Sequence, residues 1–130
     1  MNLLILGFHH VAIIASDYQR SKHFYTTILG AQIIAETYRA DRQSYKLDLR
    51  FGDGSQIELF SFPHPPARIT NPEACGLRHL AFSVENLDKV VAFLQAQAVS
   101  CEPIRIDPLT NKRFTFLRDP DDLPLELYEM

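Results

Sequence analysis

Residues 9–30 read HHVAIIASDYQRSKHFYTTILG, and this stretch decides the fold because its pattern recurs later in the chain. Its segment HVA at residues 10–12 matches HLA at residues 79–81, at an offset of 69 residues. Phe24 matches Phe93 at the same offset. Two stretches with one pattern indicate an internal repeat, with one structural unit in each half of the chain.

The end of each half is repeated as well. Ile-Glu-Leu at residues 57–59 matches Leu-Glu-Leu at residues 125–127, at an offset of 68 residues. Each half therefore has a histidine in its first apolar segment and a glutamate in its last. Hydrophobic patterning alone can make two units look alike, but it does not account for a shared histidine and a shared glutamate, which are rarer inside apolar segments.

Both halves follow one order of elements, which is a strand, a helix and three more strands. In the first half we expect strands at residues 8–15, 31–39, 44–51 and 55–61, and a helix that Ser16 or Asp17 caps and Gly30 ends. A connector with four prolines follows at residues 62–76. In the second half we expect strands at residues 77–84, 101–106, 113–118 and 123–128, and a helix at residues 86–98. The expected fold is α+β, a single domain of residues 1–130 made of two βαβββ modules at about 1–61 and 77–130.

Composition excludes several classes of protein. Thirteen Lys and Arg stand against 16 Asp and Glu, with no run of like charge, so we expect no nucleic-acid partner. No apolar run approaches the roughly 20 residues of a membrane span, and the N-terminus lacks the features of a signal peptide. Cys75 and Cys101 stand apart and outside any CxxC pair, so we expect free thiols and a cytoplasmic protein.

Glu58 and Glu126 each lie between aliphatic residues in an apolar strand segment. A carboxylate that is buried must be paired, protonated or bound to a metal. Strand alternation leaves another reading open, in which only the flanking residues face the core and the glutamate faces solvent. With His10 and His79 at equivalent places, the set of two nitrogens and two oxygens suits a borderline divalent cation. We therefore predict a metal site formed by His10, Glu58, His79 and Glu126.

The other three histidines fit this site less well. His9 is adjacent to His10 and points to the opposite face of a strand, and only His10 has a counterpart in the repeat. His23 falls on the first expected helix and His64 in the connector, where we expect surface or packing roles.

The chain resembles the vicinal oxygen chelate superfamily over nearly its whole length. The likeness rests on HHVAIIASDYQRSKHFYTTILG at residues 9–30, QIELF at 56–60, GLRHLAFSVENLD at 76–88 and FTFLRDPDDLPLELYEM at 114–130. It implies paired βαβββ modules around a metal, the fold of glyoxalase, bleomycin-resistance proteins and dihydroxybiphenyl dioxygenase. Within the superfamily, the chain is most similar to small bacterial proteins described as glyoxalase I-like, or lactoylglutathione lyase-related.

The His-Glu-His-Glu ligand pattern of glyoxalase I falls on His10, Glu58, His79 and Glu126. The resemblance then implies one divalent cation per chain, Ni, Co, Zn, Fe or Mn, that polarises the adjacent oxygens of a hemithioacetal or similar hydroxy-ketone. It also implies that Glu126 is the catalytic base and Glu58 its partner. Two positions depart from the family pattern. Ile14 replaces an arginine that helps to hold the glutathione carboxylate, and Asp122 replaces the glycine of the usual DPDG turn.

Other activities remain open because one scaffold carries several reactions. Fosfomycin-resistance transferases and extradiol dioxygenases resemble a three-ligand version, with His10, His79 and Glu126 as ligands and Glu58 unbound. A non-catalytic small-molecule binder of the same fold is the third alternative. Such binders usually lose the metal residues, so the presence of all four favours an enzyme.

The substrate anchor and the assembly are less defined by the sequence. The cationic residues that could neutralise a substrate anion are Arg39, Arg42, Lys46, Arg78 and Arg113. Arg113 ranks first because it begins the strand-like run RFTFL close to Glu126. In the glyoxalase I-like relatives the facing modules come from different subunits, so the resemblance implies a C2 homodimer with sites at the interface.

Overall fold

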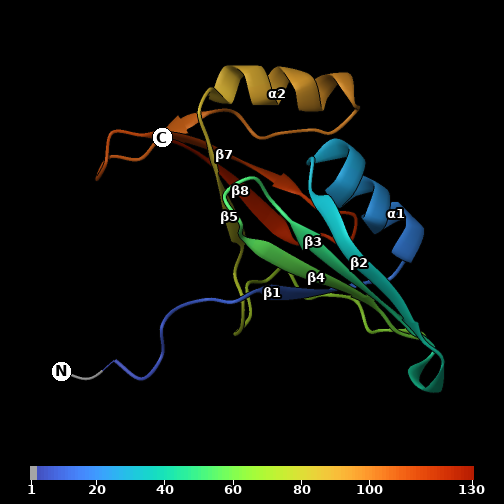
Figure 1. The fold of residues 1–130 in the computed structure, drawn as a ribbon. Coiled ribbons are helices and arrows are strands. Elements are labelled where there is room, and N and C mark those ends of the chain that lie inside the picture. Colours follow the sequence, from blue (N-terminus) through green and yellow to red (C-terminus); the bar gives the residue numbers. More distant parts are fainter. Residues whose placement is uncertain (1–2) are drawn as a thin grey trace. The chain divides into compact units, whose positions relative to one another are not determined.

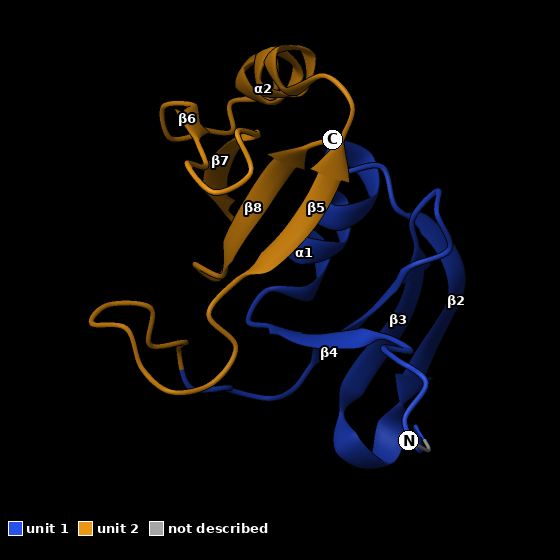
Figure 2. Ribbon diagram, turned by 90° about the vertical axis from the view of Figure 1, so that its left-hand side faces the viewer, with its two compact units in different colours: residues 1–66 blue, residues 67–130 orange. Residues whose placement is uncertain are grey.

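The computed structural model describes residues 3–130, shown as a ribbon in Figure 1. The chain divides into two compact units, Met1–Pro66 and Ala67–Met130, which Figure 2 shows in different colours. The division falls inside the expected connector. Each unit contains one four-stranded mixed sheet and one α-helix, so the α+β class predicted from the repeat is confirmed.

Unit 1 has the order βαβββ. Its elements are β1 (Val11–Ala15), α1 (Tyr18–His23), a π-helical segment (Phe24–Ile28), β2 (Gln32–Arg39), a short 3₁₀ helix (Ala40–Arg42), β3 (Ser44–Arg50) and β4 (Gln56–Ser61). The sheet order is β1-β4-β3-β2, with β1 parallel to β4 and the other pairs antiparallel. The first and last strands of the unit are therefore neighbours.

Unit 2 repeats this topology. Its elements are β5 (Leu80–Val84), α2 (Leu87–Ala96), β6 (Arg105–Ile106), β7 (Arg113–Arg118) and β8 (Pro124–Glu129). The sheet order is β5-β8-β7-β6, and β5 is parallel to β8. The equivalent register in both units, with Ala12 opposite Glu58 and Ala81 opposite Glu126, shows that the repeat extends to strand pairing.

Each sheet has one buried face and one partly exposed face. In β4, Ile57 and Leu59 are buried and lie on the face that packs toward α1. In β8, Leu125 and Leu127 are buried in the same way and α2 packs against that strand. Because side chains alternate along a strand, the intervening glutamates lie on the opposite face of each sheet. We call this second face the open face.

The first helix begins at the cap that the sequence predicts, and the second begins one residue after the expected start. Asp17 caps α1 by accepting a hydrogen bond from the amide of Arg20, and Asn86 caps α2 through the amide of Lys89. Each cap satisfies an amide that has no partner inside its helix. The first helix ends in the π-helical segment rather than as a uniform α-helix, and there the Thr26 hydroxyl donates to the carbonyl of Lys22.

Three strands are shorter than expected, and one of them, β5, begins at Leu80 rather than at Leu77. β1 begins at Val11 rather than at Phe8, which is fully exposed. β6 contains only Arg105 and Ile106, because Pro103 has no amide hydrogen to donate to a ladder. The amide of Glu102 still donates to the carbonyl of Phe116, so the chain runs beside β7 before the regular strand begins.

The turn before β8 explains one departure from the family pattern. Asp122 has a φ of 69°, a left-handed conformation in which glycine is usual and in which Asp is among the better tolerated residues. Asp119 accepts hydrogen bonds from the amides of Asp121 and Leu123 and holds the turn. The substitution is therefore structural.

Two expectations about the chain as a whole can be compared with the structure. Cys75 and Cys101 are free thiols, and burial raises the pKa of Cys101. Within residues 3–130 no helix has the length and apolar character needed to cross a lipid bilayer.

Candidate functional site

In unit 1 the structure brings together the first predicted pair of ligands. His10 directly precedes β1, and Glu58 lies in the middle of β4, the strand next to β1. The Nε2 atom of His10 is 3.4 Å from an Oε atom of Glu58. The Glu58 side chain is 15% exposed and that of His10 is 36% exposed, so the carboxylate is largely removed from solvent. Strand pairing therefore creates this contact between residues 48 positions apart.

Unit 2 contains an equivalent pair. His79 directly precedes β5, and Glu126 lies in the middle of β8. The Nε2 atom of His79 is 3.3 Å from an Oε atom of Glu126, whose side chain is also 15% exposed. Both histidines thus lie one residue before the strand in which the sequence placed them, and both meet their glutamate.

The spacing within each pair suits two ligands of one cation. Nitrogen and oxygen ligands at about 2.1 Å from an ion, with an angle near 109° between them, are about 3.4 Å apart. The observed separations of 3.4 and 3.3 Å agree with this value. They are also longer than a normal hydrogen bond between nitrogen and oxygen, which is about 2.9 Å. The donors therefore fit a divalent ion in both geometry and chemistry.

Each unit contributes one histidine–glutamate pair, which is half of the predicted four-ligand metal site. Among residues 3–130, no group of three or more His, Cys, Asp or Glu side chains is placed to hold a metal ion. A four-ligand centre thus requires both pairs together.

The residue before each histidine contacts the other ring nitrogen. The Nδ1 atoms of His9 and His10 are 2.9 Å apart, and Nη1 of Arg78 is 3.0 Å from Nδ1 of His79. Arginine only donates hydrogen bonds, so Nδ1 of His79 accepts in this arrangement and the ring hydrogen lies on Nε2. Binding of a metal through Nε2 requires the hydrogen to move to Nδ1 and Arg78 to turn away.

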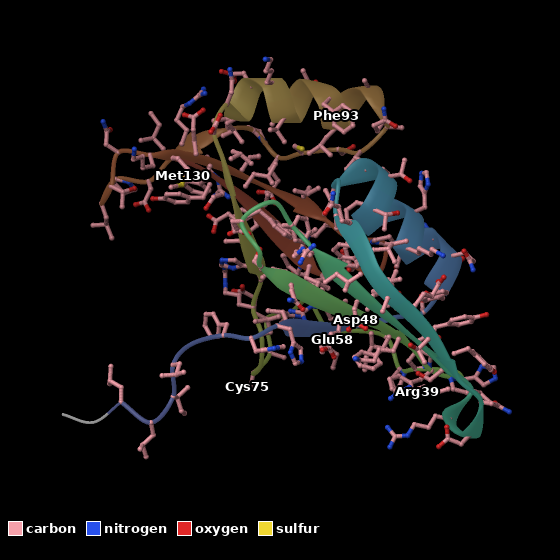
Figure 3. All side chains as sticks on the ribbon, viewed as in Figure 1. Arg39, Asp48, Glu58, Cys75, Phe93 and Met130 are labelled. Atoms are coloured by element: carbon pink, nitrogen blue, oxygen red, sulfur yellow. The ribbon has the colours of Figure 1, made fainter. Side chains whose placement is uncertain are left out.

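The two glutamates have different neighbours on the open face. Asp48 lies opposite Glu58 on β3, and Figure 3 shows these two side chains on adjacent strands. Lys46 is 3.1 Å from Asp48 and 3.9 Å from Glu58. In unit 2 the residue opposite Glu126 is Phe116. Asp48 was not predicted from the sequence as part of the site. A signal was available, because the 68-residue offset that aligns Glu58 with Glu126 also aligns Asp48 with Phe116. An acidic residue in one unit thus corresponds to an aromatic residue in the other.

Arg113, the predicted substrate anchor, lies elsewhere. It alternates with Phe114 and Phe116 along β7, so it points to the helix-covered face rather than to the face of Glu126. Its guanidinium donates hydrogen bonds to Glu129 and to Asp88 at the start of α2. This ion-pair network ties β7 and β8 to α2, and the placement argues against contact with a substrate at Glu126.

The ion-pair network also changes the pKa of Glu129. Hydrogen bonds from Arg113, and next from the backbone amide of Leu87, lower the pKa of Glu129 to about 2. The same carboxylates raise the pKa of Arg113.

The other predicted anchors differ in their surroundings. Arg39 packs over the rings of Phe60 and Phe62 and donates to the Ser44 hydroxyl. Arg42 ends the 3₁₀ helix and is exposed. Only Lys46 and Arg78 lie directly beside a predicted ligand.

The remaining histidines are exposed, as expected for His23 and His64. Ile14, where the glutathione-binding arginine would be expected, is 54% exposed and pairs with Phe60 on the open face of unit 1. Cationic groups lie nearby, because Lys46 is opposite Phe60 on β3 and Arg39 packs over the Phe60 ring.

Comparison with known proteins gives a family match over most of the chain. A model described as "Glyoxalase/Bleomycin resistance protein/Dioxygenase superfamily" matches residues 7–127. The chain is 61% identical over 127 residues to the uncharacterized protein YwkD of Bacillus subtilis (strain 168), covering 98% of this chain and 99% of that protein.

Solved structures share the fold. The glyoxalase family protein from Enterococcus faecalis matches with a TM-score of 0.90 and 47% identity, over 98% of this chain and 100% of that chain. The fosfomycin resistance protein FosX from Listeria monocytogenes, complexed with Mn(II) and 1S,2S-dihydroxypropylphosphonic acid, matches with a TM-score of 0.78. Its identity is 18%, over 97% of this chain and 93% of that chain, and at this level the likeness concerns the fold alone.

Proposed function

Because the chain belongs to the glyoxalase/bleomycin resistance protein/dioxygenase superfamily, we propose that it is a divalent-metal-dependent enzyme of the glyoxalase I type, related to lactoylglutathione lyase. The observation that carries the proposal is the repeated pairing of a histidine with a glutamate. The separations of 3.4 and 3.3 Å occur at equivalent positions of the two units. Such a repeat is expected if both pairs supply ligands to a metal ion.

The proposed cofactor is one divalent cation per chain, held by His10, Glu58, His79 and Glu126. Two imidazoles and two carboxylates accept Ni, Co, Zn, Fe or Mn without sharp discrimination. The presence of Mn(II) in a structure of FosX supports a divalent ion in this fold. Such an ion would supply Lewis acidity toward two adjacent oxygens of a small substrate.

We propose Glu126 as the catalytic base and Glu58 as its partner, and the different surroundings of the two glutamates support this division. Glu126 lies opposite Phe116 and would take a proton from one carbon of a hydroxy-ketone or hemithioacetal and return it to the next. Glu58 lies beside Lys46 and would act as the partner of Glu126. The aromatic rings of Phe114 and Phe116 would limit the access of water to Glu126.

We extend the proposal to a C2 homodimer in which His10 and Glu58 of one chain and His79 and Glu126 of its partner form each site. Two observations support this assembly. Each unit holds only one ligand pair, and a two-fold axis combines such pairs into two equivalent sites. The apolar residues Leu4, Leu6 and Phe8 are also more than 90% exposed, as expected of a segment that a partner covers.

The proposed partner is a small molecule rather than a nucleic acid or a membrane, and the proposed location is the cytoplasm. The even balance of charge and the free thiols of Cys75 and Cys101 support this setting.

One observation favours a second candidate function. Lys46, 3.9 Å from Glu58, gives this carboxylate a partner that is not a metal. If Glu58 stays with Lys46, the remaining ligands are His10, His79 and Glu126, the three-ligand set of a fosfomycin-resistance-like transferase or an extradiol dioxygenase. A non-catalytic binder has no comparable support.

Metal analysis and proton exchange test the proposal. Purified protein loaded with Ni, Co, Zn, Fe or Mn should hold one ion per chain, and His10→Ala, Glu58→Gln, His79→Ala and Glu126→Gln should each lose it. The matched control His23→Ala removes an exposed histidine and should keep the ion. The loaded enzyme should exchange carbon-bound hydrogen of hemithioacetals or hydroxy-ketones for deuterium, followed by NMR. Full metal content in all four folded variants would refute the proposed centre.

A further inference from the structure

Unit 2 contains a pocket of about 270 Å³ that is rich in arginine. We call it the arginine pocket and define it by its charged residues, which are Arg68, Arg78, Arg105, Arg118, Glu73 and Glu102. The lining holds four arginines and two glutamates, a net charge of +2, and Asp122 outside the lining pairs with Arg118. Its size suits a small molecule or one end of a larger one.

Not every arginine of the pocket is neutralised by a carboxylate. Arg68 hydrogen-bonds to the carbonyls of Leu77 and Arg78 and, among residues 3–130, forms no ion pair. Arg105 contacts Glu102 at 3.3 Å and lies over the ring of Phe114, 5.0 Å from its centre. Neutral carbonyls and aromatic rings orient a guanidinium without cancelling its charge. Arg68 therefore keeps its full charge for a further anion, and Arg105, which shares its charge with Glu102, has further N–H groups that can donate to the same anion.

The pocket adjoins the catalytic glutamate of the proposed enzyme. Phe116 lines the pocket and lies directly opposite Glu126, and its ring meets that of His79 edge-on with centres 5.1 Å apart. Arg118 and Pro124, which also line the pocket, pair two residues further along the same strands. Two residues of a strand span about 7 Å. The pocket thus continues the open face of unit 2 from Glu126.

We propose that the arginine pocket binds the anionic group of the substrate, a carboxylate or a phosphoryl group, while the reacting carbons lie at Glu126. This inference rests on the proposed function and narrows its substrate to a small acid or phosphate with adjacent oxygens. A separation of about 7 Å corresponds to roughly six bonds of extended chain.

Three matched probes test the pocket by titration calorimetry. Glycerol, glycerate and glycerol 1-phosphate share a vicinal diol and differ in the group at one end. The titrations use the full-length protein after chelator treatment, so the pocket is measured independently of a metal. We expect glycerate or glycerol 1-phosphate to bind at least tenfold more tightly than glycerol, and the tighter of the two identifies the anion. Equal binding of all three probes would overturn the inference.

Variants assign the binding to the pocket. Arg68→Gln and Arg105→Gln should each weaken binding of the anionic probe by about tenfold, the usual contribution of one charged hydrogen bond. Arg20→Gln removes an exposed arginine of α1 and should leave binding unchanged. An equal loss in Arg20→Gln would indicate a response to net charge and would contradict the inference. Glu126→Gln should fail to bind added metal, but after chelator treatment it should still bind the anionic probe. A failure of the metal centre is therefore distinguishable from a failure of the pocket.

Discussion

Asp48 lies directly opposite Glu58 across the antiparallel pairing of β3 and β4, so two carboxylates face each other on one side of the unit 1 sheet. Lys46 approaches both, at 3.1 Å from Asp48 and 3.9 Å from Glu58. Like charges in direct opposition destabilise a sheet, and a cation between them offsets their repulsion. Since Phe116 stands in the place of Asp48 in unit 2, the two halves of the proposed site are chemically different.

Replacing Lys46 should expose this repulsion. Lys46→Gln should lower the free energy of unfolding of the chelated protein by about 0.5–1 kcal/mol. A bound divalent cation should restore more stability to the variant than to the wild type, because it takes over the neutralising role. Urea denaturation with and without metal measures both quantities. Lys89→Gln, an exposed lysine on α2, is the control. Equal gains from metal in variant and wild type would contradict the prediction.

Glu58 separates the candidate enzyme classes. Glu58→Gln should weaken metal binding by at least tenfold and lower turnover if the centre has four protein ligands. Metal titration followed by the deuterium-exchange assay tests both effects. A fully active, fully loaded Glu58→Gln variant would instead assign the protein to the three-ligand transferase or dioxygenase type. Asp48→Asn is a matched control, because it changes the neighbouring carboxylate on the same face.

Arg113 should matter for stability and not for turnover. Arg113→Gln leaves the open face unchanged, so kcat/KM should stay within about twofold of the wild type. The unfolding free energy should fall, because Glu129 and Asp88 lose their partner. If Arg113→Gln folds normally but has a strongly raised KM, then Arg113 contacts the substrate, as the sequence predicted.

The pH dependence of this effect follows from Glu129. Its pKa is lowered from 4.5 to about 2, first by the hydrogen bonds of Arg113. A lowered carboxylate pKa gives stability that is present above the unfolded value and lost as the pH falls through the folded value. The stability difference between wild type and Arg113→Gln should therefore be largest above pH 4.5 and shrink toward pH 2. A difference that stays constant over this range would show that the ion pair is not its source.

Subunit mixing tests the proposed dimer. His10→Ala and His79→Ala chains are each expected to be inactive. If sites are shared, a mixed dimer has one site that lacks both histidines and one that is intact. Random exchange of an equimolar mixture should then restore about a quarter of the wild-type activity, since half of the dimers are mixed and each has one of two sites. No recovery after exchange proven by mass spectrometry, or a monomer by light scattering, would mean that each chain builds its own site.

The local pattern of the chain was sufficient for much of the fold. The 69-residue offset between His10 and His79 predicted two βαβββ units, and the strand alternation around Glu58 and Glu126 allowed each glutamate to lie on the face opposite its aliphatic neighbours. Such features can be read from sequence because the face of a strand residue depends on its immediate neighbours. Strand ends were predicted less well, since the loss of pairing before Arg105 depends on the partner strand as well as on Pro103.

The sequence by itself thus determined the repeat, the elements, the cap of the first helix and the four candidate ligands. The tertiary structure decided which side chains meet: that His10 reaches Glu58 because β1 lies parallel to β4, and that Asp48 and Lys46 lie beside Glu58. It also decided that Arg113 faces α2 although Glu126 is its close neighbour in sequence. The physical reason is that strand order and register join distant residues through non-local hydrogen bonds, and a shift of one residue in register moves a side chain to the other face of the sheet.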